Sequence, residues 1–172
     1  MKIILCGYMG SGKSRVGSRL SKSISMSFLD LDQFIAEREC RTISDIFANS
    51  GEVYFRKIER QALENVLSME GNVVISLGGG TPCYADNMTY MLAHSDVKII
   101  YLKASIQTIV KRLESSRKSR PLIDFLKDNL SKTEFVAKHL FERSYFYEQS
   151  HFVVTVDGKR LKEITAECLQ LF

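Results

Sequence analysis

The chain has 172 residues, 45% of them hydrophobic, which is the length of a single domain that can bury a core. Its formal net charge of +4 suits an anionic ligand and is too small for a dedicated nucleic-acid-binding protein. The four cysteines form no CxxC pair and no histidine stands at metal-ligand spacing, so we expect no disulfide framework, no zinc site and a reducing, cytoplasmic setting. No apolar run approaches the ~18 residues of a membrane span, and we expect no signal peptide or anchor.

Residues 7–14, GYMGSGKS, follow the phosphate-loop pattern of Gly, four residues, Gly, Lys and a hydroxyl residue. The apolar run at residues 3–6 predicts a buried strand before this loop. Val16, Leu20 and Ile24 recur at helical spacing after it. The motif therefore stands in the strand, loop and helix context that it requires.

Each residue type in this loop serves a separate physical purpose. Gly7, Gly10 and Gly12 let the backbone turn sharply and bring its amide hydrogens close to a phosphate. The helix that starts near Lys13 points its positive end at the same anion. We expect Lys13 to hold β- and γ-phosphate oxygens and the Ser14 hydroxyl to bind Mg²⁺. The alternative, a glycine-rich turn before an ordinary helix, is disfavoured by the intact spacing.

Residues 26–31 predict a second strand, whose end carries Asp30, Leu31 and Asp32. Alternation along a strand puts the two carboxylates on one side and Leu31 on the other. If this end lies beside the phosphate loop, Asp30 is near the metal and Asp32 reaches the substrate. Alternatively, one of the two carboxylates caps the following helix, and capping is compatible with catalysis.

Two apolar patterns at helical spacing, residues 43–47 and 55–67, stand on either side of a break at Gly51. Arg56 lies at the start of the longer helix, four residues after Glu52. Taken alone, this spacing favours a structural ion pair on an exposed face.

Residues 73–77 form the most strand-like run of the chain and lead into Gly78, Gly79 and Gly80. Three glycines at the carboxyl end of a buried strand let a ligand approach the backbone within hydrogen-bonding distance. A flexible turn is the alternative, and the entropic cost of such a run argues that it has a use.

Residues 97–102 predict a further strand, and Ser105 is a plausible cap for a helix at residues 106–113. Residues 111–120 then hold five basic residues and one acidic residue. A solvated loop is the default for such a charge run, but the composition also suits a lid that closes over phosphates.

The remaining pattern predicts a helix at residues 130–147, a strand at residues 152–156 and a closing helix at residues 161–171. Arg143 and Tyr147 lie one turn apart on the long helix. Five strands that alternate with helices predict one α/β domain over residues 1–172. Its architecture is a three-layer α/β/α sandwich around a five-stranded parallel sheet.

In this order, the landmarks resemble the shikimate kinase family, in the nucleoside-monophosphate-kinase-like group of P-loop NTPase folds. The resemblance spans residues 2–156. It rests on GYMGSGKS, LDLD at 29–32, FRKIE at 55–59, GGG at 78–80, RPL at 120–122 and Arg143 with Tyr147. It implies a mobile lid at about 111–126 and a substrate-binding helical region at about 32–60. It also implies that the γ-phosphoryl group of ATP is transferred to the 3-hydroxyl of shikimate, with shikimate 3-phosphate and ADP as products, in chorismate and aromatic amino acid biosynthesis.

The resemblance also assigns roles to individual residues. Asp32 resembles the carboxylate that accepts the hydroxyl proton, and Lys13 and Arg120 the cations that meet the transferring phosphate. Asp30 would lie near Mg²⁺, through water, with Ser14 as a direct ligand. The substrate-binding set would be Asp32, Arg56, Gly78, Gly79, Gly80 and Arg143, with the two arginines on the substrate carboxylate. The ATP-binding set would be Gly10, Ser11, Gly12, Lys13, Ser14, Arg15, Arg112 and Arg120, with residues 157–160 near the adenine.

Two alternatives stay open at this point. Another small-molecule kinase of the same fold, acting on gluconate or a nucleoside monophosphate, would keep the phosphate loop. A nucleotide-binding module without turnover would draw on the positive charge balance. We expect ATP/ADP and shikimate as partners, no nucleic acid or membrane partner, and a monomer.

Overall fold

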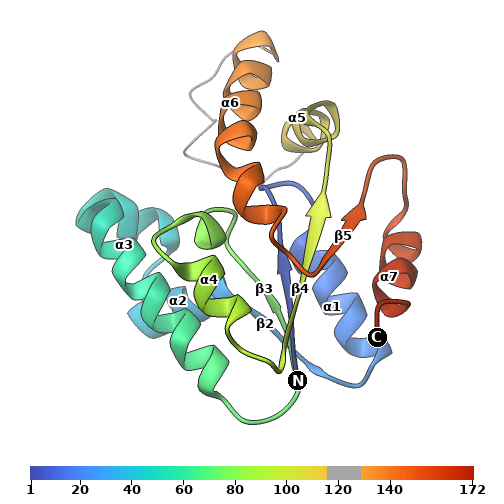
Figure 1. The fold of residues 1–172 in the computed structure, drawn as a ribbon. Helices are drawn as coiled ribbons and strands as arrows, with labels where there is room; N and C mark the ends of the chain where they lie inside the picture. The colour runs from blue at the N-terminus through green and yellow to red at the C-terminus, as the bar shows by residue number, and fades with distance from the viewer. Residues whose placement is uncertain (116–128) are drawn as a thin grey trace.

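The computed structural model describes residues 1–115 and 129–172, and within them five parallel strands form one sheet in the order β2-β3-β1-β4-β5 (Figure 1). The predicted five-stranded parallel sheet is confirmed. The strands are β1 (Lys2–Cys6), β2 (Ser27–Asp30), β3 (Val73–Ser76), β4 (Val97–Lys103) and β5 (Phe152–Thr155).

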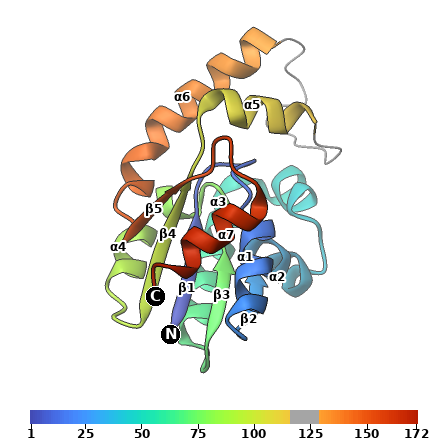
Figure 2. The ribbon, with the colours of Figure 1, turned by 90° about the vertical axis from the view of Figure 1, so that its right-hand side faces the viewer.

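Helices cover both faces of this sheet (Figures 1 and 2). One face carries α1 (Lys13–Ser23) and α7 (Leu161–Leu169), and the other carries α3 (Ile43–Ser68) and α4 (Asn87–Leu92). A short helix, α2 (Leu31–Glu39), packs on α3. Two further helices, α5 (Ile106–Glu114) and α6 (Asn129–Tyr147), pack against each other beyond the carboxyl ends of the strands.

The central strand β1 is buried along its whole length, between β3 and β4. Because helices cover both of its faces, its residues read as a continuous apolar run without polar alternation. The loop at residues 7–14 leaves its carboxyl end, while both chain termini lie at the other end of the sheet (Figure 1). This arrangement places the phosphate-loop sequence at the edge where open α/β sheets bind ligands.

The predicted extension of the second strand to Leu31 is wrong, because β2 ends at Asp30 and α2 begins at Leu31. The Asp30 carboxylate accepts hydrogen bonds from the backbone amides of Asp32 and Gln33, at 3.2 and 3.4 Å. These bonds satisfy the first free amides of the helix and fix its start. Asp30 is therefore the cap that the alternative interpretation described.

The other strands and helices lie where the sequence patterns predict them, with ends that differ by one or two residues. Gly51 interrupts α3 with φ 80° and ψ 172°, which is the predicted break. Ser105 caps α5 by accepting a hydrogen bond from the Thr108 amide at 3.2 Å. The predicted lid at 111–126 begins in the last turns of α5, and its part beyond residue 115 lies outside the described residues. Within the two described ranges, no helix is long and apolar enough to cross a membrane.

Candidate active site

The phosphate-loop sequence folds into a loop that needs its glycines. Gly7, Gly10 and Gly12 have φ values of 135°, 84° and 101°, in the region that side chains other than glycine rarely adopt. A β-carbon at Gly7 would also lie 2.7 Å from the carbonyl oxygen of Leu102. Gly12 is the residue that precedes α1, so the loop runs directly into the amino end of that helix. The expected anion-binding geometry is therefore built.

Two side chains of this loop are arranged for a phosphate group. The Lys13 ammonium is buried and donates to the carbonyl oxygens of Gly7 at 2.9 Å and Tyr8 at 3.1 Å. The Ser11 hydroxyl is buried and has no hydrogen-bond partner among the described residues. A buried hydroxyl without a partner carries an energetic penalty that a bound phosphate oxygen would relieve.

Ser14 and Asp30, the two residues expected at the metal, lie in direct contact. The Ser14 hydroxyl donates to Asp30 Oδ2 at 2.6 Å and lies 3.3 Å from the Ser76 hydroxyl. Asp30 and Ser76 are register partners at the carboxyl ends of β2 and β3. Mg²⁺ prefers such oxygen ligands and commonly combines one carboxylate with water and phosphate oxygens. The described residues hold no cluster of three or more His, Cys, Asp or Glu side chains, and a magnesium site of this kind requires none.

Asp32 lies in the first turn of α2, among charged groups from several elements. Burial, together with the negative charges of Asp30 and Glu59, raises the pKa of its carboxyl from 3.8 to about 6. The positive charges of Lys13 and Arg56 lower this pKa and so oppose the rise. Asp32 therefore lies within electrostatic reach of both the phosphate-loop lysine and the α3 arginine.

Arg56 makes the ion pair with Glu52 that its spacing predicts, at 3.1 Å, and a second one with Glu59 at 2.8 Å. The Glu59 side chain is only 1% exposed, and it also accepts a hydrogen bond from the Thr81 hydroxyl at 2.6 Å. Glu52 is 60% exposed. A β-carbon at Gly80 would lie 2.8 Å from Arg56 Nη2, so the guanidinium packs directly on the glycine run.

The glycine run also meets Asp32 and the phosphate loop. A β-carbon at Gly78 would lie 2.8 Å from Asp32 Oδ1. A β-carbon at Gly79 would lie 3.3 Å from the Met9 amide nitrogen. The three glycines thus allow three close approaches, and a flexible turn alone would not require them.

Arg143 reaches the same region from α6. Burial raises the pKa of the Cys83 thiol to about 11, while the charges of Arg143 and Arg56 both act to lower it. The two arginines, 87 positions apart in the chain, therefore lie within electrostatic reach of one half-buried thiol that follows the glycine run. Tyr147, one turn after Arg143, donates its hydroxyl to the Gly79 carbonyl oxygen.

Arg112, from α5, forms hydrogen bonds with the backbone of the phosphate loop. Its Nη1 donates to the carbonyl oxygens of Gly10 and Ser11, both at 3.1 Å, and its Nη2 donates to that of Val156 at 3.4 Å. It thereby joins the loop to Val156, which directly precedes the segment expected near the adenine, residues 157–160.

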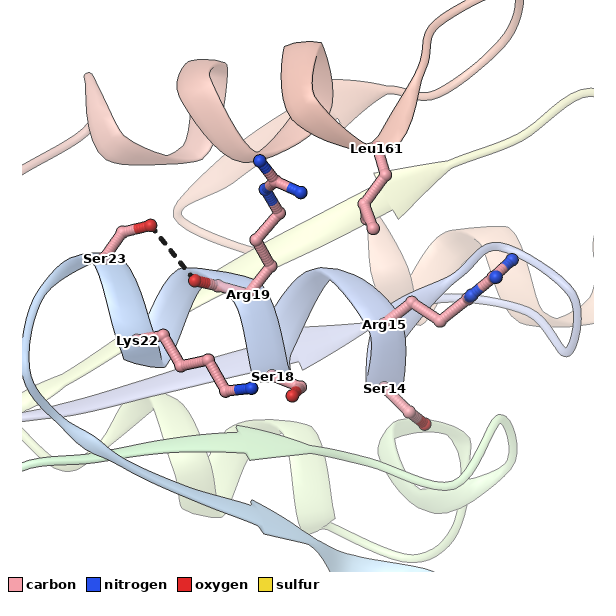
Figure 3. A pocket seen from close by; sticks show the side chains of 7 residues that line it. All are labelled: Ser14, Arg15, Ser18, Arg19, Lys22, Ser23 and Leu161. Atoms are coloured by element: carbon pink, nitrogen blue, oxygen red, sulfur yellow. Dashed lines mark hydrogen bonds between the residues drawn. The ribbon is translucent and has the colours of Figure 1, made fainter.

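Arg15 lies on the exposed side of α1, in a groove of about 670 Å³ between that helix and the start of α7 (Figure 3). The groove begins at Ser14 and is lined further along by Ser18, Arg19, Lys22, Ser23 and Leu161. Figure 3 shows the Arg15 side chain directed along α1 toward the phosphate-loop end. An arginine in the first turn has an unfavourable interaction with the helix dipole, which a bound anion nearby would offset.

The structure thus brings together nearly all of the expected site residues at one end of the sheet, and Arg120 lies outside the described residues. Sequence reasoning missed Ser76, Glu59 and Tyr8. Glu59 carried a usable signal, because it stands three residues after Arg56 on a helix. Ser76 and Tyr8 carried none, because the groups that their side chains contact, Ser14 and His139, lie far away in the chain.

Comparison with known proteins agrees with this geometry. A family model described as shikimate kinase matches residues 9–172. The shikimate kinase of Flavobacterium psychrophilum is 43% identical over 166 residues, which cover 96% of this chain and 95% of that protein. The crystal structure of shikimate kinase from Bacteroides thetaiotaomicron has a TM-score of 0.92 and 32% identity, and the match covers 99% of this chain and 97% of that one. Shikimate kinase from Acinetobacter baumannii in complex with shikimate has a TM-score of 0.87 and 28% identity, with 99% and 91% covered. The protein belongs to the shikimate kinase family.

Proposed function

We propose that this protein transfers the γ-phosphoryl group of ATP to the 3-hydroxyl of shikimate, giving shikimate 3-phosphate and ADP. This reaction belongs to chorismate and aromatic amino acid biosynthesis. Besides family membership, the observation that carries the proposal is that Asp32 and Arg56 both pack on the glycine run, with Asp32 also within electrostatic reach of Lys13. A carboxylate near both a phosphate-binding cation and a carboxylate-binding cation can meet the one hydroxyl that must face ATP.

At the nucleotide end, the loop amides, Lys13 and the Ser11 hydroxyl hold the β- and γ-phosphates. Ser14 and Asp30 would hold Mg²⁺, the first directly and the second through water. When bound, the ion neutralises charge on the phosphate oxygens. Arg15 and Arg112 complete the ATP-binding set, and Arg120 is assigned to it from the family resemblance alone.

At the substrate end, Arg56 and Arg143 bind the shikimate carboxylate, and the Gly80 amide contacts the ligand. Arginine suits this task because its planar fork matches a carboxylate. When shikimate binds, its carboxylate would take the place of the exposed Glu52 carboxylate beside the Arg56 guanidinium. The buried Glu59 would keep its ion pair and hold Arg56 in place. A fixed carboxylate at one end of a small ring determines which hydroxyl points at the phosphate.

Asp32 accepts the proton of the attacking hydroxyl. The transition state of phosphoryl transfer is loose, so the protein contributes mainly position and charge. Cytoplasmic location and a monomeric state stay predictions from the sequence.

A coupled assay of ADP release with shikimate, gluconate and AMP as acceptors tests this function. We expect turnover with shikimate alone. Comparable efficiency with gluconate or AMP would favour another small-molecule kinase of this fold. ATP binding without ADP formation in the presence of any of the three acceptors would favour a nucleotide-binding module. Salt-dependent binding to RNA or DNA would support that outcome.

The raised pKa of Asp32 leads to a prediction about pH. The kcat/KM for shikimate is expected to fall tenfold per pH unit below about 6, because only the ionised carboxylate accepts a proton. A pH–rate profile measures this effect. A profile that stays flat down to about pH 5 would contradict the assignment of Asp32 as the base.

Gly80→Ala provides a steric prediction for the substrate end. Gly80 has φ −92°, which alanine adopts without strain, but its β-carbon would collide with Arg56. The displaced guanidinium should raise the shikimate KM by about tenfold, or ~1.4 kcal/mol, with an unchanged ATP KM. Steady-state kinetics with each substrate varied in turn measure both constants. If the variant has the wild-type melting temperature and an unchanged shikimate KM, Arg56 does not bind the substrate.

A further inference from the structure

We infer that Tyr8 is a positioning residue for the reaction: its ring, which belongs to the phosphate loop, holds Arg143 at the substrate end of the site. The inference rests on the proposed function and adds a residue to it. The sequence motif leaves this position free, because Tyr8 is one of the four unspecified residues of the loop.

Tyr8 contacts both halves of the site with different atoms. Its carbonyl oxygen accepts a hydrogen bond from Lys13 Nζ at 3.1 Å. Its side chain is 1% exposed, and the centre of its ring lies 5.6 Å from Cζ of Arg143. The hydroxyl lies 3.4 Å from Nδ1 of His139. The backbone of Tyr8 thus faces the lysine of the nucleotide end, while its side chain faces the arginine of the substrate end.

The α6 residues involved form a single stripe at four-residue spacing, Phe135, His139, Arg143 and Tyr147. The ring centroids of Phe135 and His139 lie 4.2 Å apart, and the ring planes of His139 and Tyr8 meet at 69°. At the end of the stripe, Tyr147 donates its hydroxyl to the Gly79 carbonyl oxygen. One face of α6 therefore docks on both ligand-binding loops, and Tyr8 is its contact in the phosphate loop.

The way in which Arg143 is held differs from that of Arg56. Arg56 lies over the Phe55 and Tyr84 rings and is also held by two carboxylates, Glu52 and Glu59. Arg143 makes no ion pair with any carboxylate in residues 1–115 and 129–172. An aromatic face attracts a guanidinium without using its N–H donors. Tyr8 therefore orients Arg143 and leaves its hydrogen-bond donors available for the substrate carboxylate.

The first measurement is turnover of shikimate by the wild type, which tests the proposed function separately. The second compares the kinetics of Tyr8→Leu with those of the wild type and tests the role of Tyr8. Tyr8→Leu removes the ring, so we expect the shikimate KM to rise about fivefold, with less than about a twofold change in the ATP KM. Tyr8→Phe keeps the ring and should restore most of the shikimate affinity. Tyr8→Met, which fills the space with a flexible apolar chain, replaces Tyr8→Leu if that variant does not fold.

Two further variants separate positioning from general packing. In an Arg143→Ala background, Tyr8→Leu should cause no additional rise in the shikimate KM, because the group that it positions is absent. Tyr90→Leu is the matched control, since it removes a tyrosine ring that lies 4.1 Å from Cζ of Arg60, away from the site. It should leave both KM values unchanged. Full additivity of the Tyr8 and Arg143 effects, or equal rises in the two KM values with Tyr8→Leu, would overturn the inference.

Discussion

Asp32→Asn is expected to lower kcat by about 10²- to 10⁴-fold, which is the usual contribution of a positioned general base. The amide keeps the size of the carboxylate but cannot accept the hydroxyl proton. Because Lys13 and the loop amides are unchanged, the affinity for ATP should stay close to that of the wild type. Steady-state kinetics and calorimetric titration with an ATP analogue measure the two effects separately.

The same substitution should stabilise the folded protein at neutral pH. The pKa of Asp32 is raised from 3.8 to about 6, so folding disfavours its ionised form. The stability contributed by the protonated group is fully present below pH 3.8 and is lost as the pH rises through about 6. The uncharged amide of the variant would carry no such loss, and its melting temperature should exceed that of the wild type at neutral pH.

A matched control is Asp96→Asn. Asp96 pairs with Lys2 at 3.0 Å, at the end of the sheet away from the phosphate loop. We expect wild-type kcat in this variant. If Asp32→Asn retained more than about a tenth of the wild-type kcat, Asp32 would be a binding residue and not the base.

Arg56→Ala is expected to raise the shikimate KM by roughly 10²-fold, equivalent to ~3 kcal/mol, through loss of a charged double hydrogen bond to the substrate. The ATP KM should change little, because Arg56 contacts α3 and the glycine run and not the phosphate loop. Initial rates over a range of shikimate concentrations at saturating ATP provide the measurement.

In this variant the buried Glu59 loses its charged partner and keeps only the hydrogen bond from the Thr81 hydroxyl. We therefore expect a lower melting temperature together with the higher KM. Arg56→Ala/Glu59→Gln removes the unpaired charge and should recover stability without recovering the KM. Arg60→Ala is the control on the same helix, since Arg60 pairs with Glu64 and Asp86. Equal KM changes in the Arg56 and Arg60 variants would mean that the effect comes from the helix and not from the substrate.

The site was predictable to different degrees in its two halves. The nucleotide half is nearly contiguous in the chain, since the loop, Lys13 and Ser14 are local and their geometry follows from glycine and helix rules. For the substrate half, the ordered landmarks pointed to Arg56 and Arg143 through a family resemblance. Spacing alone favoured a structural role for Arg56, and the structure shows that its ion pair with Glu52 does exist.

Local hydrogen bonding decided the boundary between β2 and α2, which the sequence pattern placed wrongly. The alternation at Asp30, Leu31 and Asp32 is compatible with either a strand end or a helix start. The Asp30 carboxylate bonds the next two free amides, so the chain turns into α2 one residue after β2. Asp32 consequently approaches the glycine run from a helix, where its half-buried carboxyl lies within electrostatic reach of charges of both signs.

By itself, the sequence determined the order of strands and helices, the parallel sheet and the phosphate loop, because periodicity and glycine spacing act over a few residues. Only the tertiary structure decided which distant side chains share a pocket. The pKa of Asp32, the burial of Glu59 and the stacking of Arg143 on Tyr8 all depend on elements from different parts of the chain. Such contacts arise from packing in three dimensions, and no local pattern of residues encodes them.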